Sequence, residues 1–136
     1  MKRSVFIKLS TFSAVVISVP WLNACNEKPI KAAIAQPQFL SHIFDAKTML
    51  ATGQDYLKQT PDENSKNKLA DLLITNSSVT SSSDIKTIHS YFDNRVKQDF
   101  ANGKIAVVDG WILSVTEARQ CALYSLMEEN NSENKH

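Results

Sequence analysis

The chain has 136 residues, of which 43% are hydrophobic and 21% are charged, and 15 basic against 14 acidic side chains leave a net charge of +1. This length predicts a single domain. A balanced charge disfavours nucleic-acid binding, which usually needs a basic face. Two cysteines exclude a disulfide scaffold, and three glycines leave no room for a glycine-rich phosphate loop. Composition therefore indicates a small, exported globular protein.

Residues 1–24 have the layout of a signal peptide. Their only charges are the positive Lys2, Arg3 and Lys8, and an apolar run follows at 14–22. The run is too short to cross a hydrocarbon core of about 30 Å as a helix. Removal of these three basic residues leaves 12 basic and 14 acidic groups, so the mature chain is mildly acidic.

The end of this signal resembles a bacterial lipobox, in which Leu and a small residue precede a Cys that receives a lipid. The sequence is Leu22-Asn23-Ala24-Cys25. An ordinary signal peptidase prefers small side chains at both −3 and −1, and Leu22 fits the first of these badly. We therefore expect Cys25 to be the lipidated N-terminus of a membrane-anchored lipoprotein that faces the periplasm. The alternative is an incidental Cys at the end of another kind of signal.

The start of the chain resembles a second export signal. Residues 3–10, RSVFIKLS, are similar to the twin-arginine pattern, with Ser4 in place of the second Arg. Because one Arg is missing, we expect export through the general secretory channel. A basic start that merely contains Phe-Ile-Lys is the alternative.

The mature chain divides by composition into three parts. Residues 25–37 contain two prolines and no sustained apolar period, which predicts a tether. Residues 38–127 carry helical and extended apolar patterns and form the predicted domain. The polar residues 128–136 predict a disordered tail.

Two helices are predicted at the start of the domain. The first begins after Asp45, its N-cap, and ends near Lys58. Thr60-Pro61 is typical of an N-cap followed by Pro at the first helical position, and predicts the start of the second. The buried stripe of this second helix is expected to comprise Leu69, Leu72 and Leu73.

The third helix has the clearest pattern. A loop rich in Ser, Thr and Asn covers 75–83 and ends before Asp84, where a good N-cap is available. Gly103 is a C-terminal stop signal. Between them, apolar residues recur at the spacing of one helical face, namely Ile85, Ile88, Phe92, Val96 and Phe100.

A hairpin and a last helix complete the domain. Two apolar runs, 105–108 and 111–113, flank Asp109-Gly110, which is the strongest short-range hairpin signal; since the arms are short, a loop-like extended segment is the alternative. Residues 114–117, SVTE, form a capping box that opens a helix ending near Met127. The predicted fold class is mainly α: a small domain of about four helices with a short extended segment or hairpin before the last one.

Residues 105–126, IAVVDGWILSVTEARQCALYSL, resemble a known family. They are similar to the end of the small subunit of membrane-associated flavin-dependent sugar and alcohol dehydrogenases, a group that includes the gluconate 2-dehydrogenase subunit 3 and sorbitol dehydrogenase small-subunit families. The shared pattern is an extended "VVD" segment followed by a helix start like T-x-E-A-L. The matching residues are Val107, Val108 and Asp109, then Thr116, Glu117 and Ala118.

This resemblance implies a non-catalytic accessory subunit that assists folding, export or membrane attachment of a large partner. In that family the large subunit holds FAD, oxidises a sugar or an alcohol, and often passes electrons to a cytochrome c. The residues of this chain agree with a missing active site. His42, His89 and His136 are dispersed, whereas a metal centre needs clustered ligands, and no Ser or Cys stands in a nucleophile motif. We expect Cys121 to be buried as a small hydrophobe.

Trp111, beside the Asp-Gly turn, admits two interpretations. We favour a role in covering the small core. In the other interpretation it is an exposed anchor for a large partner, because Trp, Tyr and Arg dominate interface energetics. The candidate partner-binding residues are then Asp109, Trp111, Arg119 and Tyr124. The alternative function is a free-standing envelope lipoprotein that binds another protein.

Overall fold

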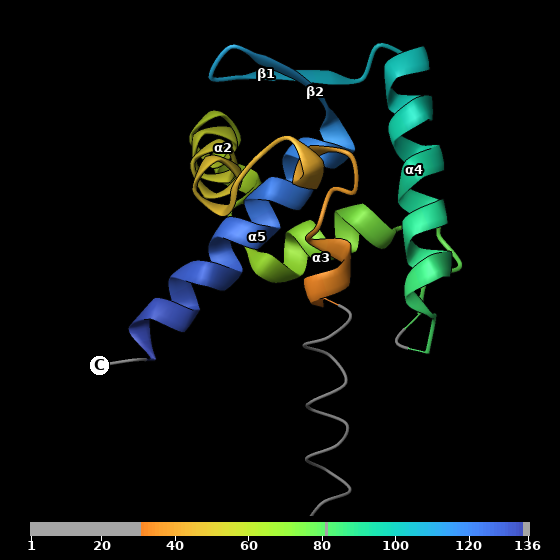
Figure 1. The fold of residues 1–136 in the computed structure, drawn as a ribbon, viewed down its shortest axis with the longest axis horizontal. Coiled ribbons are helices and arrows are strands. Elements are labelled where there is room, and N and C mark those ends of the chain that lie inside the picture. The colour runs from red at the N-terminus through yellow and green to blue at the C-terminus, as the bar shows by residue number, and fades with distance from the viewer. Residues whose placement is uncertain (1–30, 81, 135–136) are drawn as a thin grey trace, which may run out of the picture. The chain divides into compact units, whose positions relative to one another are not determined.

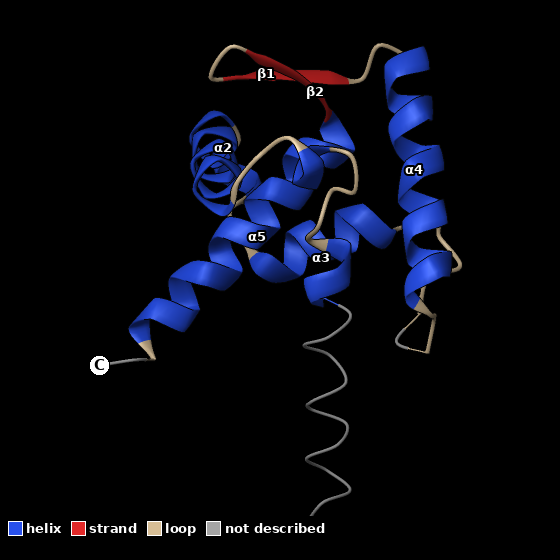
Figure 2. Ribbon diagram, viewed as in Figure 1, coloured by secondary structure: helices blue, strands red, loops and turns tan. Residues whose placement is uncertain are grey.

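The computed structural model describes residues 31–80 and 82–134. Cys25, the signal peptide and the first part of the predicted tether lie outside these residues. The described part is mainly helical, with a two-stranded antiparallel hairpin directly before the last helix (Figures 1 and 2). The predicted fold class is therefore confirmed.

The last helix, α5 (Val115–Glu133), occupies the centre of the domain. It contacts α2 (Ala46–Gln59), α3 (Lys66–Ile74) and α4 (Ile85–Ala101), and Figure 1 shows it running diagonally between them. Its fully buried side chains are mostly small and apolar: Ala118, Cys121, Ala122 and Leu123. Cys121 is thus buried, as expected for a small hydrophobe. Its burial raises the pKa of the thiol to about 12.

Helices α2 and α5 are in close backbone contact at Gly53. A Cβ atom at this position would lie 2.1 Å from the carbonyl oxygen and 2.6 Å from the carbonyl carbon of Cys121. Real Cβ atoms do not come so near to backbone atoms, so only glycine permits this crossing. The side chain of Asp45 caps α2 by accepting a hydrogen bond from the amide of Thr48 at 2.7 Å, as predicted.

The folded domain begins earlier than the predicted boundary at residue 38. Residues 31–34 are helical, and Ile34 and Ala35 are buried. The amide Nε2 of Gln120 donates to the carbonyl oxygen of Ile34 at 2.9 Å. The prediction of a tether is therefore wrong for 31–37, because contacts with the distant α5, which leave no local period in the sequence, fold this segment into the domain.

The second predicted helix starts later than expected. Thr60-Pro61 begins only the short 3₁₀ helix η2 (Pro61–Glu63), after which Asn64 leaves the helical conformation. Helix α3 begins at Lys66, with Ser65 as its N-cap. Thr60-Pro61 therefore does mark the start of a helix, but this helix is a single 3₁₀ turn. Within α3, Leu69 and Leu73 are fully buried, whereas Leu72 is only partly buried.

Helix α4 has the predicted ends but only part of its predicted buried face. Asp84 accepts a hydrogen bond from the amide of Thr87 at 2.8 Å, and Gly103 has a φ of +70° just beyond the last turn. In the middle of the helix Ile88 and Phe92 are buried. At its two ends, Ile85 and Phe100 are exposed.

The hairpin forms as the Asp-Gly signal predicted, and the loop-like alternative is excluded. Strand β1 (Ile105–Val108) pairs with β2 (Trp111–Ser114), and the pair nearest the turn is Val108 with Trp111. Asp109 and Gly110 have φ values of +49° and +81°. Positive φ at both central residues is the requirement of a type I′ turn.

The capping box at the start of α5 is confirmed. The hydroxyl of Ser114 accepts from the amide of Glu117 at 3.0 Å, and the Glu117 carboxylate accepts from the amide of Ser114 at 2.9 Å. The helix continues to Glu133, well beyond Met127. The predicted disordered tail is therefore wrong over 128–133, where polar residues without Gly or Pro extend the helix.

We expect Ser114→Ala to lower the free energy of unfolding by about 0.5–2 kcal/mol, because it removes the N-cap acceptor of the central helix. Urea denaturation followed by circular dichroism measures this change. Ser90→Ala, at an exposed position within α4, is the matched control and should change stability by less than about 0.5 kcal/mol. Equal stability of the two variants would contradict the prediction.

Candidate functional site

The hairpin is apolar on both of its faces. Its inner face carries Val108 and Leu113, which are buried against the domain. Its outer face carries Ile105, Val107 and Ile112, and the last two are directly opposite each other across the strands. These three outer side chains, which we call the hairpin surface, are all exposed, Ile112 at 64%.

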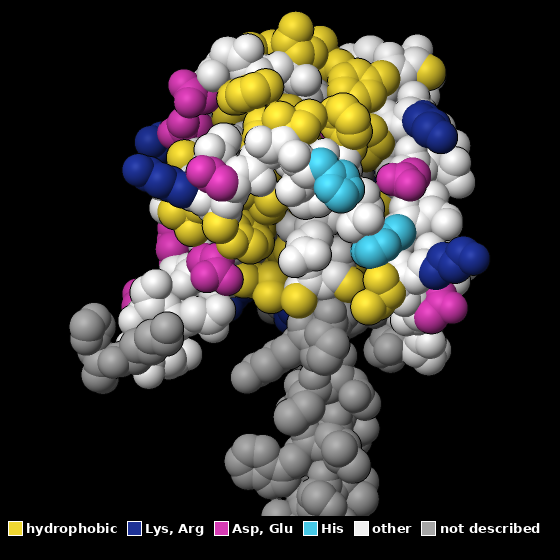
Figure 3. All heavy atoms as spheres, in the orientation of Figure 1, with side chains coloured by type: hydrophobic (Ala, Val, Ile, Leu, Met, Phe, Trp, Pro, Cys, Tyr) yellow, Lys and Arg dark blue, Asp and Glu magenta, His cyan; other side chains and the backbone are white. Residues whose placement is uncertain are grey.

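The hairpin surface belongs to a larger apolar area. Figure 3 shows hydrophobic side chains gathered over the hairpin and the part of the domain next to it. Grouped exposed apolar side chains are characteristic of interaction sites, whereas scattered single ones are not. This part of the molecule is therefore the candidate functional site.

Trp111 lies at the edge of this site and combines the two roles considered for it. Its ring packs edge-on against the buried Phe44, with ring centroids 4.8 Å apart and an interplanar angle of 64°. It thus covers the core, while 43% of its surface remains exposed. Asp109, also exposed, lies in the adjacent turn, so the structure brings these two candidate residues together.

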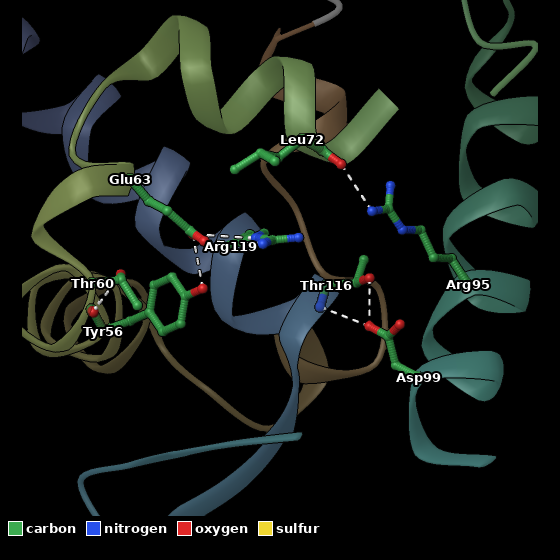
Figure 4. A network of polar contacts seen from close by, with 8 residues as sticks. All are labelled: Tyr56, Thr60, Glu63, Leu72, Arg95, Asp99, Thr116 and Arg119. Carbon is green, nitrogen blue, oxygen red and sulfur yellow. Dashed lines mark hydrogen bonds and ion pairs between the residues drawn. The ribbon is translucent and has the colours of Figure 1, made fainter. Parts of the chain in front are cut away.

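Arg119 forms an ion pair with Glu63 inside the domain. Its Nη2 and Nε donate to the two carboxylate oxygens of Glu63 at 2.9 and 3.2 Å. The hydroxyl of Tyr56 also donates to Glu63, at 2.8 Å (Figure 4). Arg119 therefore ties α5 to η2 and α2. The sequence prediction that groups it with Trp111 did not foresee these partners, because they lie far away along the chain.

The contacts among Arg119, Glu63 and Tyr56 shift the pKa values of Glu63 and Tyr56. Burial raises the pKa of Glu63, but hydrogen bonds from Arg119 and Tyr56 outweigh burial, so that the pKa lies below its usual value. Burial, together with the hydrogen bond to Glu63, raises the pKa of Tyr56 to about 12. The network is thus ionised at Glu63 and neutral at Tyr56 around pH 7.

Tyr124 is separated from the hairpin. It is half-buried on α5, and the nine helical steps from Val115 to Tyr124 span about 14 Å. The structure therefore places Asp109 and Trp111 next to each other, whereas Arg119 bonds to Glu63 and Tyr124 lies about 14 Å along α5 from the start of that helix.

A polar groove of about 390 Å³ lies between α4 and the start of α5, lined by residues that include Arg95, Asp99 and Thr116. The Asp99 carboxylate accepts from the amide and the hydroxyl of Thr116 at 2.9 and 2.6 Å. Arg95 donates to the carbonyl oxygens of Leu72 and Leu73 at the end of α3, and Figure 4 shows the bond to Leu72. These side chains hold the helices together, so we assign the groove a structural role.

The hairpin surface was missed in the sequence analysis, although a signal for it exists. Both arms of the hairpin are continuous apolar runs rather than alternating ones. Strands with this pattern are normally covered on both faces. When a two-stranded hairpin packs against its own domain on one side only, this pattern therefore predicts that a binding partner buries the other face.

Residues 31–80 and 82–134 carry neither a group of metal ligands nor a membrane-spanning helix. Within these ranges no three His, Cys, Asp or Glu side chains are grouped as metal ligands, and none of the helices has the length and apolarity needed to cross a bilayer. His89 makes a side-chain hydrogen bond with Gln38 at 3.1 Å. Comparison with protein-family models, curated proteins and solved structures gave no match.

Proposed function

We propose that this chain is a non-catalytic accessory subunit that binds a larger protein through the hairpin surface. The observation that carries the proposal is the exposed apolar outer face of the hairpin, formed by Ile105, Val107 and Ile112. Covering these residues contributes about 1 kcal/mol each, since about half of each residue's surface, 46–64%, is still exposed. Trp111, with its ring fixed by Phe44, is placed to anchor the edge of the contact.

The proposed partner is the large subunit of a flavin-dependent sugar or alcohol dehydrogenase of the bacterial cell envelope. Support comes from residues 105–126, whose sequence resembles the small subunits of such enzymes and which form the hairpin and the first part of α5. The partner holds the FAD and performs the oxidation, and a cytochrome c accepts the electrons. This chain, anchored through a lipid on Cys25, attaches the enzyme to the membrane.

Co-purification from membranes tests this proposal. The lipoprotein is purified in mild detergent from cells carrying either Ile112→Ser or Ile85→Ser. Both residues are isoleucines of nearly equal exposure, 64% and 62%, but Ile85 begins α4, at the end of that helix away from the hairpin (Figure 1). We expect Ile112→Ser to lower the amount of co-eluting flavoprotein about fivefold, which corresponds to about 1 kcal/mol, and Ile85→Ser to leave it unchanged.

Thermal unfolding of both variants checks that they remain folded. If folded Ile112→Ser retains the wild-type amount of partner, the hairpin surface is not the interface. A co-eluting protein without flavin would contradict the dehydrogenase assignment and support the free-standing lipoprotein. Arg119→Ala is unsuitable for this experiment, because it breaks the contact with Glu63 inside the domain.

A further inference from the structure

The hydrogen-bond register of the hairpin determines which backbone groups point out of the sheet. The pair that closes the two-residue turn is hydrogen-bonded, so bonded pairs recur at every second position. The amide of Val115 donates to the carbonyl oxygen of Lys104 at 3.1 Å, which continues this alternation beyond the strands. Val107 and Ile112, directly opposite each other, are therefore a non-hydrogen-bonded pair. The amide and the carbonyl oxygen of each point away from the neighbouring strand.

The two edges of the hairpin differ in how these outward groups are used. On β1, the carbonyl oxygen of Val107 accepts from Nε2 of Gln59 in α2 at 3.1 Å. On β2, the amide of Ser114 donates to the carboxylate of Glu117 in the capping box. The amide and the carbonyl oxygen of Ile112 have no hydrogen-bond partner among the described residues. The edge of β2 therefore offers one free donor and one free acceptor on a single residue.

A free donor and a free acceptor on one edge residue are the groups to which an added β-strand binds. Strand β2 contains neither a charged residue nor Pro, which commonly keep edge strands from pairing. The sheet of the described part has only two strands (Figure 2), and so small a sheet gains stability from a third. The side chain of Ile112 already belongs to the hairpin surface, so a strand beside β2 would be continuous with the proposed interface.

We propose that the partner subunit adds an extended segment to the edge of β2, with its backbone bonded to the amide and the carbonyl oxygen of Ile112. This inference rests on the proposed function and names how the partner is recognised. The residue of the segment opposite Ile112 is apolar and extends the hairpin surface. Its two neighbours point to the other face of the sheet, where Trp111 is 43% exposed.

Amide hydrogen exchange in the native complex tests this proposal. The lipoprotein is purified in mild detergent together with its flavoprotein, and residue-resolved mass spectrometry compares it with the chain expressed without that partner. We expect the amide of Ile112 to exchange at least about tenfold more slowly in the complex, and that of Val107 on the other edge to change less than about twofold. Equal slowing of both amides, or none at Ile112, would show that the partner adds no strand and would overturn the proposal.

Two proline variants test the same hydrogen bond. Ile112→Pro removes the outward N–H and leaves the bonds within the hairpin in place, since proline is tolerated where an edge N–H faces away from the sheet. Val107→Pro is the matched control, because it removes a side chain of the same surface and the outward N–H of the other edge. Ile112→Pro should lower the amount of co-eluting flavoprotein about fivefold more than Val107→Pro, the factor expected for one hydrogen bond. Thermal unfolding checks that both variants are folded, and equal losses would contradict the added strand.

The outcomes separate this inference from the proposed function. If Ile112→Ser lowers the amount of flavoprotein but the amide of Ile112 is unprotected in the complex, the interface stands and only the added strand is wrong. A wild-type chain that purifies without flavoprotein contradicts the proposed function, and the inference falls with it. A chain that sediments as a dimer in the same detergent, with the Ile112 amide protected before the partner binds, would assign the edge to a second copy and overturn the proposal.

Discussion

Gly53→Ala should lower the free energy of unfolding by about 3 kcal/mol or more, because it forces a methyl group against the backbone of α5. The added Cβ would lie 2.1 Å from a backbone oxygen of α5, and backbone atoms of two packed helices cannot move aside as a flexible side chain does. Urea denaturation followed by circular dichroism measures the loss.

Gly110→Ala is the matched control. Its added methyl group meets no atom within 4 Å, and only its φ of +81° makes alanine unfavourable. This cost is about 1–2 kcal/mol. A Gly53→Ala variant as stable as the wild type would show that α2 and α5 do not cross as closely as the structure places them.

Arg119→Ala should lower the free energy of unfolding by about 2–4 kcal/mol, because it leaves Glu63 partly buried without its cation. The side chains of Arg119 and Glu63 are only 20% and 13% exposed. Asp55→Asn is the control, since it breaks the exposed ion pair with Lys58 and should cost less than about 1 kcal/mol. Equal effects of the two substitutions in urea denaturation would contradict the assigned role of Arg119.

The same ion pair predicts a dependence on pH. The folded state lowers the pKa of Glu63 below its usual 4.5, so the stabilisation is fully present above that value and is lost as the pH falls through the lowered pKa. Glu63→Gln lacks this contribution at every pH. The difference in unfolding free energy between wild type and Glu63→Gln should therefore shrink between pH 7 and the acid range, and a constant difference would contradict the prediction.

The elements that sequence reasoning predicted correctly depend on chemistry within a few residues. The caps at Asp45, Asp84 and Ser114 each bond to an amide three positions along the chain, and the Asp109-Gly110 turn joins two residues that are three positions apart. Such signals do not depend on the tertiary fold. The hairpin before the last helix, and hence the site carrying Asp109 and Trp111, could therefore be located in advance.

The features that sequence reasoning missed depend on contacts between distant parts of the chain. The segment around Ile34 is held in the domain by a hydrogen bond from Gln120, and Arg119 forms an ion pair with Glu63, which lies 56 positions away in the chain. Gly53, a poor helix former, owes its place to the backbone of Cys121. Neither periodicity nor local propensity encodes these contacts, so the N-terminal boundary and the role of Arg119 could not be predicted.

The position of α5 in the chain has a consequence for biosynthesis. The helix that contacts α2, α3, α4 and the hairpin follows all of them in the chain. Until it emerges, the preceding helices have no common core to bury their apolar faces, and short helices alone are marginal in water. The elements before Val115 can therefore bury their apolar faces against a common core only after α5 has been synthesised.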